Sequence, residues 1–263
     1  MGQENKYYDT EGIIVRKVRL GEAARILTIL TPSAGKVSAV AKGVCRSSSK
    51  MSGHLELFTH SQIELARGRS IDTVINCQTI QSFHHAKSDL TGSAYATYFC
   101  ELSDAFSEHN LECRSLFALL GTCLARLNED LNRAELVRCY FELQCLAESG
   151  FRPQSRVCVS CQGTIRDETN YFSLSSGGIL CPFCSQYESF SFPVSLTAIK
   201  ILRVLSEENL ETCLRLRIKP EGFSELNLIL GRFICYVLER TLRTPAWIAK
   251  VRSIGTSQAL RTP

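Results

Sequence analysis

Apolar and polar positions alternate in short runs over the first 80 residues, and turn-forming residues separate these runs. Such alternation is typical of half-buried β-strands, because successive side chains of a strand point to opposite faces. Five runs have this pattern, at residues 13–18, 25–30, 36–41, 62–66 and 71–77. They predict a small closed barrel, for which the five-stranded OB-fold is the leading candidate and an SH3-like barrel is the alternative.

From about residue 85 onward, apolar positions recur every three or four residues, which is the period of an amphipathic helix. This spacing predicts helices within residues 95–106, 116–127, 132–149, 196–205 and 224–242. Asn132 can cap the third helix, with Glu135 three positions later as in a capping box, and Gly150 followed by Pro153 ends it. The chain after the barrel is therefore predicted to be mainly helical.

These patterns together predict a multi-domain α+β protein in which a cysteine-rich module interrupts a helical domain. The predicted parts are an OB-fold barrel at residues 1–82, a helical domain at 83–154 and 191–243, a four-cysteine module at 155–190, and a flexible basic tail at 244–263. The tail is predicted from its charge, because it contains Lys250, Arg252 and Arg261 and no acidic residue.

The cysteine-rich module contains two C-x2-C pairs, Cys158 with Cys161 and Cys181 with Cys184. Residues 162–180 separate the pairs, a spacing typical of zinc sites. Four thiolates fill the coordination sphere of Zn²⁺, so the sequence predicts one structural zinc ion and no open position for a substrate. A disulfide or a redox-active pair is the alternative for these cysteines.

Composition describes an ordinary globular protein, with 44% hydrophobic and 21% charged residues among 263. The longest apolar run, residues 226–238, is interrupted by Arg232 and is too short for a membrane span. The polar N-terminus predicts no signal peptide, and nine of the thirteen cysteines lie outside the two pairs. Together these features favour a reducing, cytoplasmic location and no membrane partner.

Basic residues are concentrated in the predicted barrel, where the first 80 residues contain 11 Lys+Arg against 7 Asp+Glu. OB-folds bind nucleic acid strands across one face of the barrel with basic residues and aromatic rings. The predicted nucleic-acid-binding residues are Arg25, Lys36, Lys42, Arg46, Lys50, Arg67 and Arg69. Because the barrel has few aromatic residues, we expect contacts to phosphate and little sequence preference. The alternative is an ordinary solvated surface.

Three groups of short motifs occur in a fixed order over roughly the first 185 residues. They are TEGIIVR (10–16) with GE (21–22) and LTPSAGK (30–36); AKG (41–43) with the Ser-rich stretch 46–50, Gly53, Leu55 and Phe58; and FEL (141–143) with GFRP (150–153) and CVSC (158–161). In this order and spacing they resemble the RecO family of bacterial recombination mediators. One departure is that the stretch 46–50 contains only two basic residues, Arg46 and Lys50.

The resemblance implies an N-terminal OB-fold, a helical domain and a zinc module. It also implies binding of single- and double-stranded DNA without sequence specificity, annealing of complementary strands, and a bacterial, nucleoid-associated location. With RecR, family members help to load the recombinase RecA onto DNA covered by single-strand-binding protein (SSB).

The resemblance further implies a pocket in the helical domain for the acidic tail of SSB, which ends in phenylalanine. Such a pocket requires a cation at its rim, because the tail ends in a carboxylate. Arg138, with Arg133 behind it, is the predicted cation. The alternative for both arginines is an ion pair with a neighbouring glutamate such as Glu135 or Glu142.

The sequence contains no phosphate-binding Gly-x4-Gly-Lys-Ser/Thr loop, no nucleophile elbow and no HExxH motif. Together with the resemblance to the RecO family, this leads us to expect a non-enzymatic DNA-binding protein of recombinational repair. The main alternative is a zinc-stapled protein-interaction scaffold with weak or no direct DNA binding. A zinc hydrolase is a second alternative, and the four-thiolate set argues against it.

Overall fold

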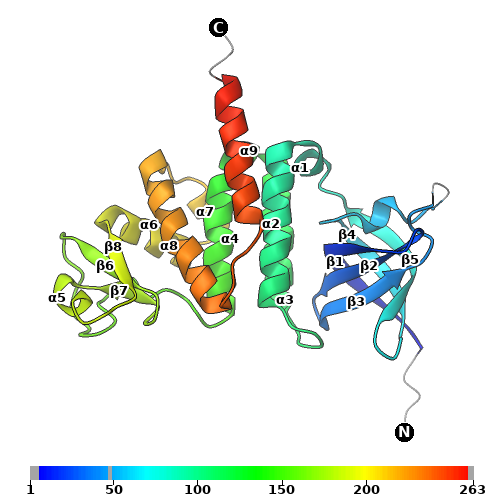
Figure 1. Ribbon diagram of the computed structural model, residues 1–263, viewed down its shortest axis with the longest axis horizontal. Coiled ribbons are helices and arrows are strands. Elements are labelled where there is room, and N and C mark those ends of the chain that lie inside the picture. The colour runs from blue at the N-terminus through cyan, green and yellow to red at the C-terminus, as the bar shows by residue number, and fades with distance from the viewer. Residues whose placement is uncertain (1–5, 47–48, 260–263) are drawn as a thin grey trace. The chain divides into compact units, whose positions relative to one another are not determined.

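The computed structural model describes residues 6–46 and 49–259 of the chain (Figure 1). The chain divides into two compact units. The first comprises Met1–Leu131 together with Arg243–Pro263, and the second comprises Asn132–Leu242. No helix in the described ranges is both long and apolar enough to cross a membrane.

The first unit begins with a closed barrel of five strands in the order β1-β2-β3-β5-β4. The strands are β1 (Tyr7–Leu20), β2 (Ala24–Thr31), β3 (Gly35–Ala41), β4 (His60–Ala66) and β5 (Asp72–Gln81), with a short 3-10 turn, η1 (Gly53–Leu55), before β4. All pairs are antiparallel except β3 with β5. This order and closure are those of the OB-fold, so the predicted fold class is confirmed.

Alternation along the strands fills the barrel interior, as the sequence pattern predicts. On β3 every second residue is buried, which places Val37, Ala39 and Ala41 in the core. Gly12 of β1 is required at a close approach, because a Cβ there would lie 2.3 Å from Cγ2 of Ile29. A register shift between Ile14 and Arg16 lets the long β1 pair with β4 at one end and β2 along the other.

Helices complete the first unit after a change from strand to helix between residues 81 and 84. They are α1 (His84–Ser88), α2 (Leu90–Phe106), α3 (Arg114–Glu129) and α9 (Thr244–Ala259). The side chain of Asp89 caps α2 by accepting from the backbone N–H of Gly92 at 2.8 Å. Helix α2 buries an aromatic face that includes Tyr98 and Phe99, and it packs against α1, α3 and α9.

Helix α9 corrects the expectation of a flexible basic tail at residues 244–263. The carboxylate of Glu101 on α2 accepts hydrogen bonds from the backbone N–H groups of Arg243 and Thr244, both at 2.9 Å, and from the Thr244 hydroxyl. These bonds cap the start of the helix, while Ile248 and Val251 are buried. Charge alone suggested a tail, but apolar residues at helical spacing dock the segment against α2, and residues 260–263 lie outside the described ranges.

The second unit contains helices and a small three-stranded sheet of order β7-β6-β8. Its elements are α4 (Ala134–Glu148), β6 (Asn170–Ser173), β7 (Gly178–Leu180), α5 (Pro182–Ser185), β8 (Ser191–Val194), α6 (Leu196–Glu207), α7 (Leu210–Cys213) and α8 (Pro220–Leu238), preceded by the 3-10 turn η2 (Leu131–Arg133). Because this turn comes first, α4 begins two residues after the predicted cap at Asn132. Pro220, at the first turn of α8, starts that helix before the predicted residue 224.

An aromatic cluster joins the small sheet to the helices of the second unit. The ring of Phe172 on β6 lies 5.9 Å from that of Phe192 on β8 and 5.3 Å from that of Phe233 on α8. All three side chains are buried. The cysteine-rich segment is therefore supported by the same core as the helices that flank it.

Candidate metal centre and nucleic-acid interface

All four paired cysteines of the second unit come together at one point. Their sulfur atoms lie within 4.8 Å of one another, and Sγ of Cys161 is 3.9 Å from Sγ of Cys181. In a tetrahedral four-thiolate site with metal–sulfur distances near 2.3 Å, the sulfurs lie about 3.8 Å apart. The donor set therefore fits one tetrahedral metal ion, as predicted from the spacing of the cysteines.

Backbone hydrogen bonds bring the two cysteine pairs together. Val159, between the first two cysteines, donates its N–H to the carbonyl of Ile179 at 2.8 Å, and Ile179 donates to the carbonyl of Gln154 at 2.9 Å. Gly178 allows this approach, because a Cβ there would lie 2.5 Å from the Gln154 carbonyl oxygen. The first pair is thus held against β7, and the second pair follows directly at the start of α5.

The peptide environment prepares Cys158 to act as a thiolate. Burial opposes its ionisation, but backbone N–H groups from Cys161, Cys181 and Ser160 outweigh burial and lower the pKa of the Cys158 thiol to about 6. One of these donors, the N–H of Cys181, lies 3.4 Å from Sγ of Cys158. A thiolate is the form that binds metal ions.

Three of the predicted nucleic-acid-binding residues, Lys36, Arg67 and Arg69, line a groove of about 720 Å³ on the barrel. The groove is polar, and hydroxyl groups from Thr10, Ser33, Ser38 and Ser70 also line it. Cationic groups and hydroxyls are the side chains that bind phosphate oxygens. The groove therefore has the chemistry of a phosphate-binding surface.

The hairpin tip between β4 and β5 is held in place by a carboxylate. Asp72 accepts from the Tyr8 hydroxyl at 2.5 Å and from the backbone N–H of Gly68 at 2.9 Å. The guanidinium of Arg67 lies 4.5 Å from the centre of the Tyr8 ring. Burial, together with Asp72, raises the pKa of Tyr8 above its ordinary value, so the hydroxyl remains a donor.

Two of the predicted cations, Lys36 and Arg25, are already paired with carboxylates. Nζ of Lys36 lies 2.7 Å from the backbone carbonyl and 3.3 Å from the carboxylate of Asp104. Arg25 lies 3.2 Å from Glu56, a carboxylate that also pairs with Lys17. Sequence patterns gave no signal for either partner, because Asp104 lies 68 positions from Lys36 and Glu56 lies 31 positions from Arg25.

The remaining predicted cations of the barrel, Lys42, Arg46 and Lys50, are exposed on the segment between β3 and η1. Residues 47 and 48 of this segment lie outside the described ranges. Among the residues described, the groove is lined by Arg67 and Arg69 but not by this second set. The exposed cations among the predicted residues thus form two sets, Arg67 with Arg69 in the groove and Lys42, Arg46 and Lys50 on this segment.

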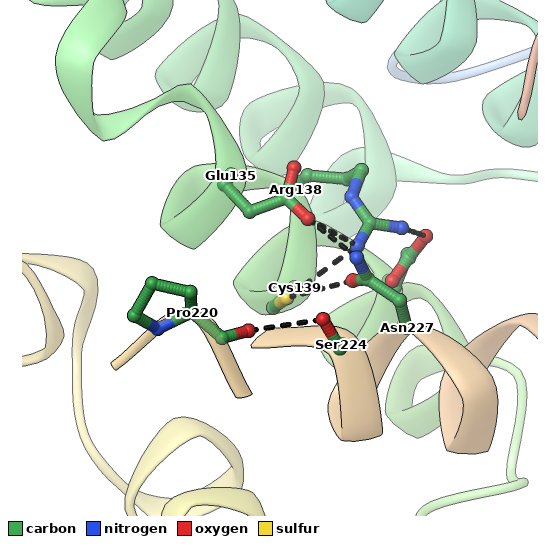
Figure 2. A network of polar contacts seen from close by, with 7 residues as sticks. Glu135, Arg138, Cys139, Pro220, Ser224 and Asn227 are labelled. Carbon is green, nitrogen blue, oxygen red and sulfur yellow. Dashed lines mark hydrogen bonds and ion pairs between the residues drawn. The ribbon is translucent and has the colours of Figure 1, made fainter. Parts of the chain in front are cut away.

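The two predicted partner-binding arginines lie on or next to α4 and are already engaged, and Figure 2 shows the polar contacts of Arg138. Arg138 is buried and lies 2.7 Å from Glu142 and 3.1 Å from Glu135, the pairing that the sequence analysis gave as the alternative. Asn227 of α8 donates to the same Glu135 oxygen at 2.6 Å, which links the two helices. Arg133 is half-buried and donates to the carbonyl of Leu216 at 3.3 Å.

Comparisons with known proteins agree along almost the whole chain. Residues 5–83 match the family model described as Recombination protein O N terminal, and residues 87–246 match the model for its C terminal part. The chain is 43% identical over 241 residues to DNA repair protein RecO of Dehalococcoides mccartyi, which covers 92% of this chain and 94% of the relative. RecO of Roseiflexus sp. is 37% identical over 98% of this chain and 89% of its own length. RecO of Symbiobacterium thermophilum is 31% identical over 94% and 98%.

Proposed function

The chain belongs to the RecO family of DNA repair proteins, and from this premise we propose that it is a non-enzymatic DNA-binding protein of recombinational repair. It binds single- and double-stranded DNA without sequence specificity and anneals complementary strands. Together with RecR it assists the loading of RecA onto SSB-coated DNA. The observation that carries this proposal is the OB-type barrel with a polar groove containing Arg67 and Arg69.

Phosphate contacts account for the proposed lack of sequence specificity. Of the large hydrophobic side chains exposed on the barrel, only Tyr7 is aromatic among the residues described, so the barrel offers little surface for base stacking. Arginine side chains and hydroxyl groups bind the phosphate backbone, which is the same for every sequence. By neutralising phosphates, the same groups reduce the repulsion between two strands that are to be annealed.

We assign Zn²⁺ as the ion of the four-cysteine centre, because four thiolates in tetrahedral arrangement are its usual structural ligands. Cys158, Cys161, Cys181 and Cys184 hold the ion. The bound ion would cross-link the two cysteine pairs, and its filled coordination sphere would leave no position for a substrate. This chemistry supports a structural and not a catalytic role.

For the SSB tail, we propose a site on the helical part of the second unit in which the two predicted arginines have different roles. Arg133 keeps part of its side chain exposed and supplies the cation for the tail carboxylate. Arg138 is paired with two carboxylates and does not contact the tail. It positions α4, and it affects binding of the tail only through the position of this helix.

Fluorescence anisotropy of a labelled single-stranded oligonucleotide, titrated at several salt concentrations, tests the proposal. Each phosphate contact contributes about −0.7 to the slope of log affinity against log salt for single strands, so replacing Arg67 and Arg69 with glutamine should reduce the slope by about 1.4. Arg215→Gln with Arg217→Gln is the matched control, since these exposed arginines have the same spacing and lie in the second unit. Replacing Lys42, Arg46 and Lys50 with glutamine measures the second group of cations in the same way.

The interaction scaffold remains a second candidate, and one observation favours it. Among the exposed large hydrophobic side chains, the second unit contributes five aromatic residues: Phe151, Phe183, Tyr187, Phe190 and Tyr236. Exposed aromatic groups are typical of protein-binding surfaces. An absence of oligonucleotide binding at low salt would reject the DNA-binding proposal and leave the scaffold.

A further inference from the structure

The loop that joins α2 to α3, residues 107–113, is built onto the barrel. Its backbone is fastened to the β2–β3 turn by three hydrogen bonds. These run from Lys36 N–H to the Glu108 carbonyl at 3.0 Å, from Asn110 N–H to the Ala34 carbonyl at 3.0 Å, and from Cys113 N–H to the Pro32 carbonyl at 3.1 Å. The loop therefore continues the edge of the barrel, although it belongs to the helical part of the chain.

Gly35 makes this attachment close. Its φ is +61°, and a Cβ there would lie 2.3 Å from the carbonyl oxygens of both Glu108 and Leu111. Only a residue without a side chain allows the loop to approach the β2–β3 turn so closely. Backbone contacts thus hold the loop at the barrel, and Sγ of Cys113 adds a contact to the carbonyl of Thr31 at 3.2 Å.

This attachment places His109 and Asn110 in the lining of the groove that also contains Arg67 and Arg69. Both loop residues are exposed. Asn110 has a φ of 60°, a left-handed conformation that asparagine tolerates better than most residues. An imidazole N–H and a side-chain amide are donors that contact phosphate oxygens in nucleic-acid complexes.

The lining of the groove contains two carboxylates and the three cations Lys36, Arg67 and Arg69. Of its two carboxylates, Asp72 is occupied by the Tyr8 hydroxyl and the backbone of Gly68, and Asp9 lies on β1. The cation Lys36 is paired with Asp104. Positive charge for a ligand therefore comes from the hairpin tip, and the loop adds the side-chain donors of His109 and Asn110. The loop also contains the exposed carboxylates of Glu108 and Glu112, of which Glu112 pairs with Arg114.

We propose that the loop at residues 107–113 is part of the nucleic-acid site, with His109 and Asn110 contacting the phosphates of a strand that also contacts Arg67 and Arg69. This inference rests on the proposed function and deepens it. The ligand is the sugar–phosphate backbone of a single strand, and the site is shared between the barrel and the helical part of the first unit. The helical part thereby takes a direct share in DNA binding.

Placing a positive or a negative charge at position 109 of the full-length chain tests the inference. The probe is a labelled thymidine oligonucleotide of about 20 nucleotides, at about 0.1 M salt where charges more than about 10 Å away are screened. His109→Lys is expected to tighten binding about two- to fivefold and to steepen the salt slope by about 0.7, and His109→Glu to weaken binding by a similar factor. His84→Lys and His84→Glu are the matched controls, because His84 is exposed on α1 and does not line the groove.

The outcomes separate this inference from the function on which it rests. If both His109 variants bind like the His84 variants while the Arg67 and Arg69 replacements weaken binding, the loop is not part of the site and the proposed function stands. If the unchanged protein binds no oligonucleotide at low salt, both fail. Opposite effects of lysine and glutamate at position 109, with unchanged melting temperatures, support the inference, because loss of folding cannot tighten binding.

Discussion

Replacing Arg138 with alanine is expected to destabilise the second unit strongly. The guanidinium joins two carboxylates of α4, and Glu142 is fully buried while the side chain of Glu135 is 15% exposed (Figure 2). Without the cation, both carboxylates remain in a site that water barely reaches. Removing one partner of a buried ion pair costs about 3–5 kcal/mol in the free energy of unfolding, because the remaining charge is left uncompensated.

The corresponding change in melting temperature follows from the size of the unit. A unit of about 110 residues has an unfolding entropy of about 0.23 kcal/mol per kelvin, so the loss corresponds to a fall of roughly 13–22 °C. Differential scanning calorimetry measures this fall directly. The transition of the first unit should stay where it is, since the substituted residue belongs to the second unit.

Arg126→Ala is the matched control, because Arg126 forms an ion pair of the same i,i+3 spacing with Glu129 on the surface of α3. Exposed pairs of this kind contribute about 0.5 kcal/mol or less. If Arg138→Ala and Arg126→Ala lower the melting temperatures of their own units by amounts that differ by only a few degrees, the reasoning about the buried pair is wrong. Weaker binding of an SSB tail peptide by Arg138→Ala would also follow from lost stability of the second unit. Arg133→Ala is therefore the better variant for testing binding of this peptide.

Three further predictions concern the metal centre, helix α9 and the barrel. Chelation of the metal, or Cys158→Ser, should lower the melting temperature of the second unit while leaving oligonucleotide affinity nearly unchanged. Elemental analysis should find one zinc per chain. A chelated protein that keeps its full melting temperature would contradict the structural role. Glu101→Ala should remove the cap of α9, cost about 1–2 kcal/mol and speed amide exchange across Thr244–Ala259, and unchanged exchange there would show that the cap is unimportant. Partial burial opposes ionisation of Glu56, but Lys17 and Arg25 outweigh burial and lower the pKa of Glu56 in the folded protein. The ionised Glu56 therefore contributes stability above its unfolded pKa, and this contribution is lost as pH falls through its folded pKa. In acid titrations, Glu56→Gln should lose less stability below about pH 4.5 than the unchanged protein.

The sequence by itself determined the features that depend on short stretches of chain. Alternation with a period of two is present in β3 and β4, and the buried residues of both strands follow it. The spacing of the two cysteine pairs likewise predicts a metal site, and their sulfur atoms lie within 4.8 Å of one another. Residues only a few positions apart encode these properties, so they can be inferred before the fold is known.

Only the tertiary structure decided which charges remain available and which segments are ordered. Lys36 and Arg25 have the same charge as Arg69, but Asp104 and Glu56, far away in sequence, pair with the first two. The C-terminal basic segment becomes helix α9 because Glu101, more than 140 positions earlier, caps it. Pairing and docking depend on which distant segments the packed core brings together, and local periodicity contains no information about that.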